Sequence, residues 1–308
     1  MRPSLKKMIA VLTAGAMLGG VISAALAFEP NDVDTAVYGI TPATLRDWKD
    51  KAAAEGDPIA PVIVGRAYEE GKGTKRDPAA ALPWFRKAAE YGNPVALYFL
   101  GGMYDVGNGV PKNDKKALRY YRLAADKGIT AAQDAVGVFF GTGRGMKADP
   151  VEAVKWHRMA AEKGYAPAQS NLGYFYQTGM GGLSQDYGQA IKWYRAAADQ
   201  GDENGQYNLG LMYFRGEGTP KNVREAEKWL RKAAEQDMAE AQNDLGVLYL
   251  LGGDGIAPSP VEAYKWLRIA AEAGVVRSKA AIGIAKEKMT PEQTKQAENE
   301  ASRWMDAH

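Results

Sequence analysis

The sequence predicts an all-α fold, a superhelical α/α solenoid of antiparallel helix pairs in repeats of 36–37 residues. The first observation is one register of aromatic residues spaced 36 to 38 positions apart: Trp48, Trp84, Tyr120, Trp156, Trp193, Trp229, Trp266 and Trp304. The second is a recurring motif of an apolar residue, a glycine, any two residues and an aromatic residue, as in Leu172-Gly173-x-x-Tyr176. A fixed period of this length is the signature of a solenoid.

Residues 1–27 are predicted to be a signal peptide. Arg2, Lys6 and Lys7 precede an uncharged run, which closes on the small-x-small pattern from Ala25 to Ala27. We therefore expect cleavage after Ala27 and a periplasmic or secreted bacterial protein, with no stable membrane span after cleavage. The alternative is an uncleaved anchor, because the uncharged run nearly reaches the length that spans a bilayer.

The rest of the chain divides by periodicity. Residues 28–40 show none and are predicted to form an N-terminal arm, whereas residues 41–308 carry the solenoid. The solenoid is expected to comprise a leading helix over 41–55, six repeats over 56–273 and a C-terminal cap over 274–308. The second helix of the cap is predicted to begin at Thr290-Pro291 and to be polar, because an end repeat must present a polar outer face.

The first helix of each repeat carries the glycine motif. A glycine in a helix interior costs about 1 kcal/mol relative to alanine, so its recurrence indicates that another helix crosses closely there. A Gly-x-Gly turn follows, and positive φ at its glycines is expected to reverse the chain. The turns contain Gly71 and Gly73, Gly107 and Gly109, Gly143 and Gly145, Gly179 and Gly181, Gly216 and Gly218, and Gly253 and Gly255.

The second helix of each repeat carries the aromatic register, with alanines three, four and five residues away. We interpret the tryptophans as core residues beside small neighbours, with a carbohydrate-stacking ladder as the alternative. Each of these helices is expected to begin after an N-cap residue seven positions before the aromatic. The predicted caps are Thr41, Asp77, Asn113, Asp149, Asp186, Asn222 and Ser259.

One complete repeat reads Ala168-Gln169-x-x-Leu172-Gly173-x-x-Tyr176-x-x-Gly179-x-Gly181, followed by Ala190-x-x-Trp193-Tyr194-Arg195-x-Ala197-Ala198. It resembles a repeat of the Sel1-like repeat family, a branch of the tetratricopeptide-like helical solenoids, and the resemblance runs in register from Thr41 to the C-terminus. The resemblance implies an adaptor that binds other proteins. Exported bacterial members of that family are associated with envelope signalling, polysaccharide control and host contact.

The amino-acid composition excludes several classes of functional site. The chain has no cysteine, which excludes disulfides, thiolate metal sites and cysteine nucleophiles. Its net charge of +2 is not that of a strongly basic nucleic-acid binder, so we expect no nucleic-acid partner. We predict no catalytic, metal-binding or cofactor-binding residue. A hydrolase that uses His157 is the least favoured alternative, because this position of the repeat is expected to pack between helices.

The candidate partner surface lies on the first helices, which line the concave side in related helical-pair repeats. Relative to the motif glycine, offsets −3, +1 and +4 are expected to be exposed; offset −3 includes Val62, Asp134, Ser170 and Asn243. Apolar and aromatic anchors gather on this stripe toward the C-terminus. The predicted partner-binding residues are Tyr98, Tyr174, Gln177, Tyr207, Leu211, Phe214, Val247 and Leu250. The alternative is that inter-repeat packing or the polar last helix covers this face.

Basic residues along the turns form a second candidate surface, near the N-termini of the second helices, which attract anions. They are Lys72, Lys112, Arg144, Lys147, Arg215 and Lys221. This edge predicts an anionic polysaccharide or peptidoglycan ligand, and a solvated rim is the alternative.

The function predicted from the sequence is an exported, non-enzymatic protein–protein interaction scaffold or adaptor in bacterial envelope signalling or regulation. We expect a monomer with a protein or peptide partner in the envelope and without a cofactor. Binding of anionic polysaccharide or peptidoglycan through the basic turns is the second prediction, and hydrolysis is the third.

Overall fold

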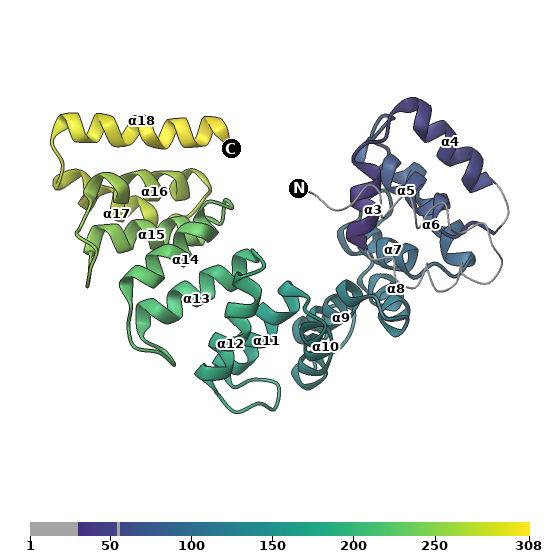
Figure 1. The fold of residues 1–308 in the computed structure, drawn as a ribbon, viewed down its shortest axis with the longest axis horizontal. Helices are drawn as coiled ribbons and strands as arrows, with labels where there is room; N and C mark the ends of the chain where they lie inside the picture. The colour runs from purple at the N-terminus through teal and green to yellow at the C-terminus, as the bar shows by residue number, and fades with distance from the viewer. Residues whose placement is uncertain (1–29, 54–55) are drawn as a thin grey trace. The chain divides into compact units, whose positions relative to one another are not determined.

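A computed structural model describes residues 30–53 and 56–308, which form helices joined by turns (Figure 1). The signal peptide predicted for residues 1–27 lies outside the described residues. Within the described ranges, none of the helices has the length and apolar character needed to cross a membrane.

The chain divides into two compact units. Unit 1 ends at Ala160, and unit 2 runs from Ala161 to His308. The helices of unit 1 are α3 (Pro30–Val37), α4 (Pro42–Ala53), α5 (Ala60–Glu70), α6 (Pro78–Glu90), α7 (Pro94–Val106), α8 (Asp114–Asp126), α9 (Thr130–Thr142) and most of α10 (Pro150–Glu162). The helices of unit 2 are α11 (Ala166–Thr178), α12 (Tyr187–Ala198), α13 (Glu203–Arg215), α14 (Val223–Ala234), α15 (Ala239–Leu251), α16 (Pro260–Glu272), α17 (Ser278–Glu287) and α18 (Pro291–Ala307).

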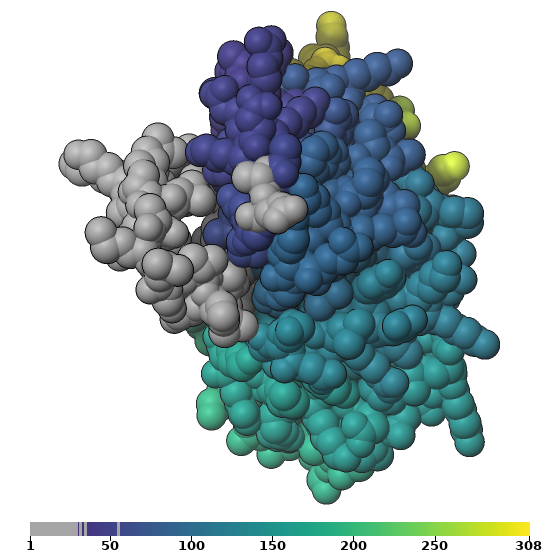
Figure 2. All heavy atoms as spheres, turned by 90° about the vertical axis from the view of Figure 1, so that its right-hand side faces the viewer, coloured from purple at the N-terminus to yellow at the C-terminus, as the bar shows by residue number. Residues whose placement is uncertain are grey.

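Consecutive helices pack as pairs in both units. The first helix of a repeat packs against the second, as α7 does with α8 in unit 1 and α13 with α14 in unit 2. Within each unit, second helices also pack against the first helix of the next repeat, for example α8 against α9 and α14 against α15. In the space-filling view, side chains of successive repeats of unit 1 touch along the face turned to the viewer (Figure 2). This packing confirms the predicted all-α solenoid of helix pairs.

The N-terminal arm differs from the expectation of an aperiodic segment, because the structure places α3 within it. Val33 and Val37, one helical turn apart, are both buried, and α3 packs against α5. One turn of apolar spacing is enough to seat a short helix on a neighbour, but it is too short to stand out as a period in the sequence.

Side-chain caps begin the second helices as predicted. Each cap oxygen accepts a hydrogen bond from the backbone amide three residues later, at 2.9–3.4 Å. These bonds satisfy an amide that a helix start leaves without an intrahelical partner. The capping residues are Thr41, Asp77, Asn113, Asp149, Asp186, Asn222 and Ser259.

Glycines with positive φ end the first helices. In five repeats the first glycine of the predicted turn takes this position, with φ between 69° and 79°: Gly71, Gly107, Gly143, Gly179 and Gly216. The sixth turn differs from the prediction. Gly252, with φ of 67°, ends α15, and Gly253 pairs with Ile256 in an isolated bridge.

The motif glycines lie where two helices cross, as predicted. A Cβ atom on any of the six glycines would lie only 2.6–2.9 Å from the side chain that faces it. The glycines are Gly65, Gly101, Gly137, Gly173, Gly210 and Gly246, and the facing side chains are Phe85, Tyr121, His157, Tyr194, Leu230 and Leu267. All six facing side chains are buried. The crossing therefore has no room for a larger residue at the glycine.

The large side chain that fills each helix crossing is thus the residue after the aromatic register. Trp229 and Trp266 are buried, as the core interpretation predicts, whereas Trp156 and Trp193 are half-buried. A residue one position along a helix points about 100° away, so two adjacent positions cannot both face the same glycine.

The last helix, α18, begins after Thr290, at the residue predicted from the sequence. Thr290 and Gln293 form a reciprocal capping box at the start of α18. The helix packs against α16, where the rings of Trp266 and Trp304 meet edge to face with centroids 5.1 Å apart. Gly283 on α17 keeps the motif glycine, but a Cβ atom there would meet no heavy atom within 4 Å.

Candidate functional site

The exposed stripe of the first helices is rotated from its predicted position. Offset −3 is buried at four glycines, where the residues are Val62, Asp134, Ser170 and Asn243. In unit 2 these side chains bond to the next repeat: Ser170 Oγ donates to Asp202, and Ser278 Oγ donates to Asn243 Oδ1 at 2.7 Å. Offset −3 therefore serves inter-repeat packing, which is the alternative that the sequence left open.

Two of the predicted partner-binding residues, Leu250 and Tyr98, do not line the pockets of unit 2. Leu250, expected to be exposed, is only 7% exposed and belongs to the core of unit 2, because its side chain points to the neighbouring helices. Tyr98 is a half-buried residue of unit 1, and its ring packs against Phe99 and Tyr121 at centroid distances of 5.6 and 5.7 Å.

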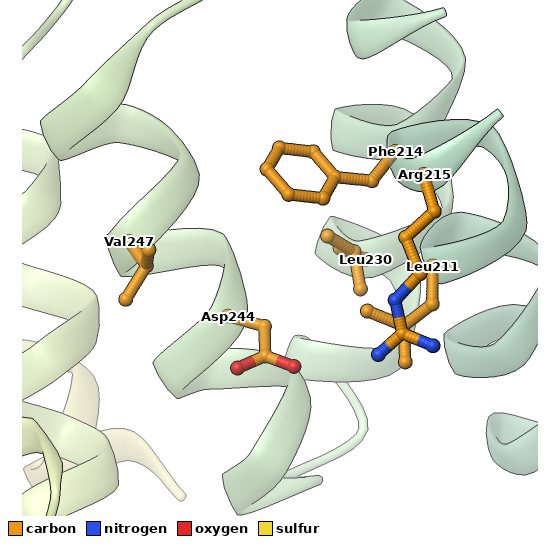
Figure 3. Close-up of a pocket in the computed structure, with 6 residues that line it drawn as sticks. All are labelled: Leu211, Phe214, Arg215, Leu230, Asp244 and Val247. Atoms are coloured by element: carbon orange, nitrogen blue, oxygen red, sulfur yellow. The ribbon is translucent and has the colours of Figure 1, made fainter. Parts of the chain in front are cut away.

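The first pocket of unit 2 brings together predicted residues from two first helices. It has a volume of about 210 Å³ and is lined by Leu211, Phe214 and Arg215 of α13, Leu230 of α14, and Asp244 and Val247 of α15. The Phe214 ring projects across the pocket toward α15, which carries Val247 and Asp244 on the facing side (Figure 3).

A second pocket adjoins the first, since Leu211 and Arg215 line both. Its volume is about 430 Å³, and its lining is Tyr174, Gln177, Thr178, Gln185, Tyr187, Asn208, Leu211, Arg215 and Glu217. Tyr174 is 49% exposed, the largest exposed aromatic surface of unit 2. We call the two adjoining pockets the groove. Five predicted partner-binding residues line it: Tyr174, Gln177, Leu211, Phe214 and Val247.

Polar contacts fix the walls of the groove. Tyr207 Oη donates to Asp244 Oδ2 at 2.9 Å, and burial together with that carboxylate raises the pKa of Tyr207. Asp244 Oδ1 accepts from Asn243 Nδ2 at 2.7 Å and from Arg277 at 3.3 Å. Tyr207, predicted to anchor a partner, thus bridges α13 to α15 and positions Asp244.

Gln177 is held in the same way on the other side of the groove. Its Oε1 accepts from Tyr194 Oη at 2.8 Å, and its Nε2 donates to Glu217 Oε2 at 3.2 Å. Tyr194 is the buried residue that faces Gly173, so the groove wall is tied directly to the helix crossing of its repeat.

The basic turn residues do not form one free row of charge. Arg144 bonds to Asp105 and, at 2.7 Å, to Asp114, and the hydrogen bond with Asp114 raises the pKa of Arg144. Lys72 lies over the Tyr38 ring and Lys221 over the Phe214 ring, at 5.4 and 5.3 Å from the centroids. Lys112 and Lys147 are exposed in unit 1, and Arg215 belongs to the groove of unit 2.

His157 is buried rather than presented to a substrate. Its Nδ1 lies 2.6 Å from Asp134 Oδ1, and the two residues are 2% and 8% exposed. His157 also faces Gly137 at the helix crossing, so its ring fills a packing position that other repeats give to aromatic or aliphatic side chains. In the described ranges, no group of three or more acidic, histidine or cysteine side chains is placed to hold a metal ion.

Residues that the sequence analysis missed include Asn208 and Asp244 on the groove walls. Both stand two residues before the motif glycine, at offset −2. Offsets −2, +1 and +5 are three and four residues apart, so they lie on one face of the helix. Arg215, at offset +5 from Gly210, lies on this face as well. Extending the stripe from offset +1 by one helical turn in each direction, to −2 and +5, would have identified them.

Comparison with known proteins supports the repeat assignment. A family model described as Sel1 repeat matches residues 63–93, 94–129, 130–165, 166–202, 204–238 and 239–275. The crystal structure of a Sel1 repeat protein from Oxalobacter formigenes is 32% identical with a TM-score of 0.65, and the match covers 70% of this chain and 85% of that one. A protective antigen of uropathogenic Escherichia coli with an SLR fold is 27% identical with a TM-score of 0.55, over 85% of this chain and 63% of that one. No curated protein matches the chain.

Proposed function

Because the chain belongs to the Sel1 repeat family, whose members are generally protein–protein interaction scaffolds, we propose that its groove binds a segment of a partner protein. The observation that carries the proposal is the convergence of Tyr174, Leu211, Phe214 and Val247 on two adjoining pockets. Half-exposed apolar and aromatic side chains around a hollow are typical anchors of a protein interface. The protein acts as a monomeric adaptor rather than as an enzyme.

The groove variant tests this function. We expect the paired substitutions Leu211→Ala and Phe214→Ala to weaken partner capture at least tenfold, or about 1.4 kcal/mol, because Leu211 lines both pockets and Phe214 lines the first. The measurement is crosslinking capture from the envelope fraction of the producing cells, quantified by mass spectrometry, with the unfolding curve recorded in parallel.

A matched control removes exposed apolar surface elsewhere in unit 2. Val276 is 76% exposed and Ile284 is 47% exposed, and neither lines the groove. Val276→Ala with Ile284→Ala should leave capture unchanged. Equal capture by the folded groove variant, with loss on charge reversal at Lys112 and Lys147, would instead favour an anionic polysaccharide or peptidoglycan at the turns.

Export is the second part of the proposed function. The positive residues, uncharged run and Ala25 to Ala27 pattern support cleavage after Ala27 and a role in envelope signalling or regulation. N-terminal mass spectrometry of the protein from its own cells should find Phe28 as the first residue, in the periplasmic or secreted fraction. A membrane-bound product that retains Met1 or Arg2 would refute cleavage.

A further inference from the structure

We propose that the groove selects a partner segment in which apolar side chains stand beside an acidic one, with the acidic group held by Arg215. This inference rests on the proposed function, because it gives the chemistry of the partner for the same groove. It follows from a difference in hydrogen bonding among the charged side chains of the groove walls. Asp244 accepts bonds from several donors, whereas Arg215 keeps most of its donors available.

Arg215 keeps hydrogen-bond donors that are available to a ligand. It ends α13 and lines both pockets, and its side chain is 51% exposed. Its ion pair with Glu217 is stretched to 3.9 Å. A guanidinium can hold a carboxylate through two parallel hydrogen bonds of about 2.8 Å, so the pair with Glu217 leaves most of the Arg215 donors available to a ligand.

The carboxylates of the groove are already engaged. Asp244 accepts three hydrogen bonds, one of them from the guanidinium of Arg277. Glu217 accepts from Gln177 at 3.2 Å. Asp244 attracts a basic ligand less strongly, because the Arg277 guanidinium already compensates its charge, and Glu217 lies beside Arg215 itself, 3.9 Å away. The groove therefore offers an incoming segment a cation rather than an anion.

Apolar side chains flank this cation. Figure 3 shows Leu211 and the Arg215 guanidinium on the α13 side of the first pocket, with Val247 on the opposite side. Lys221 adds a second cation beside the Phe214 ring, 5.3 Å from its centroid. A short acidic and apolar segment matches one or two cations set among apolar walls, whereas a polyanion is bound by many cations in a row.

The test selects ligands for the purified protein from a displayed library of random peptides. We expect enrichment of aspartate or glutamate beside leucine, phenylalanine or another large apolar residue. Arg215→Glu should lower the affinity of the enriched peptides at least tenfold and shift the selection to basic peptides. Arg303→Glu, on the exposed face of α18 and outside the groove, is the matched charge reversal and should change neither result.

Salt gives a second readout for wild-type protein. Raising the salt from about 0.1 M to about 1 M shortens the Debye length from about 10 Å to about 3 Å. The affinity of the enriched peptides should fall over this range in wild-type protein and change less in Arg215→Glu.

The other outcomes separate this inference from the proposed function. Apolar peptides without an acidic residue, lost on Leu211→Ala with Phe214→Ala but retained on Arg215→Glu, would overturn the inference and leave the proposed function standing. Peptides that bind the groove variant as tightly as wild type would overturn both. Self-association abolished by Phe214→Ala would make a second copy the occupant and would also overturn the inference.

Discussion

Replacing Tyr194 with alanine is expected to lower the free energy of unfolding by about 3–5 kcal/mol, the range for large aromatic side chains truncated in a core. Tyr194 is fully buried, and its ring fills the crossing of α11 and α12 opposite Gly173. The substitution also removes the hydroxyl that donates to Gln177, a wall of the groove. Denaturant unfolding of the variant and of wild type measures the loss.

Trp193 provides the matched comparison, because it precedes Tyr194 on the same helix and is only half-buried. Trp193→Ala should cost less than Tyr194→Ala, since less of its surface leaves water on folding. An equal or larger loss for Trp193→Ala would contradict the placement of the core column one residue after the tryptophans.

Replacing Gly173 with leucine is expected to lower the free energy of unfolding by about 1–3 kcal/mol through overpacking. A Cβ atom at this position would lie 2.8 Å from the Tyr194 ring, so the two helices would have to separate. The same change at Gly283, which has open space around it, should be neutral or slightly stabilising, because glycine is unfavourable inside a helix. Thermal unfolding of the two variants measures the difference.

A double-mutant cycle tests the contact itself. Leucine at Gly173 would occupy part of the space that Tyr194→Ala vacates, so the double variant should lose less stability than the two single losses added together. Strictly additive losses would show that the two positions do not share one crossing.

Much of the fold could be predicted from local signals that recur with a fixed period. Asp186 fixes the start of α12 through its side-chain oxygen, and Gly179 fixes the end of α11 through its positive φ, so a sequence is sufficient to place both helix ends. Gly173 indicates a close helix crossing, because glycine is unfavourable in a helix interior unless a neighbour leaves no room for a side chain.

The direction in which each side chain points around its helix was harder to predict from the sequence than the helix ends. A period of 36 or 37 residues aligns the repeats, but it does not say which of two adjacent residues meets the neighbouring helix. Tyr194 rather than Trp193 faces Gly173, and Asn243 at offset −3 bonds to Ser278 instead of facing a partner. The first difference is one residue along the helix, about 100° around its axis.

The groove depends on contacts that no single repeat contains. Leu211 and Val247 were predicted from their offset in separate repeats, and both line the first pocket. Asp244 enters the same pocket because Tyr207, in the preceding repeat, bonds to it. Arg215 was assigned to the basic turns, but its position at the end of α13 places it in both pockets.

Photo-crosslinking from inside the groove tests whether a partner protein binds there. The photoreactive residue p-benzoylphenylalanine is placed at Val247 or, as the control, at Ile284 in protein made by its own cells. We expect an adduct with a partner protein from position 247 that is lost with Arg215→Glu, and no such adduct from position 284. The same adduct in equal yield from both positions, or from position 247 regardless of Leu211→Ala with Phe214→Ala, would contradict the groove as the partner site.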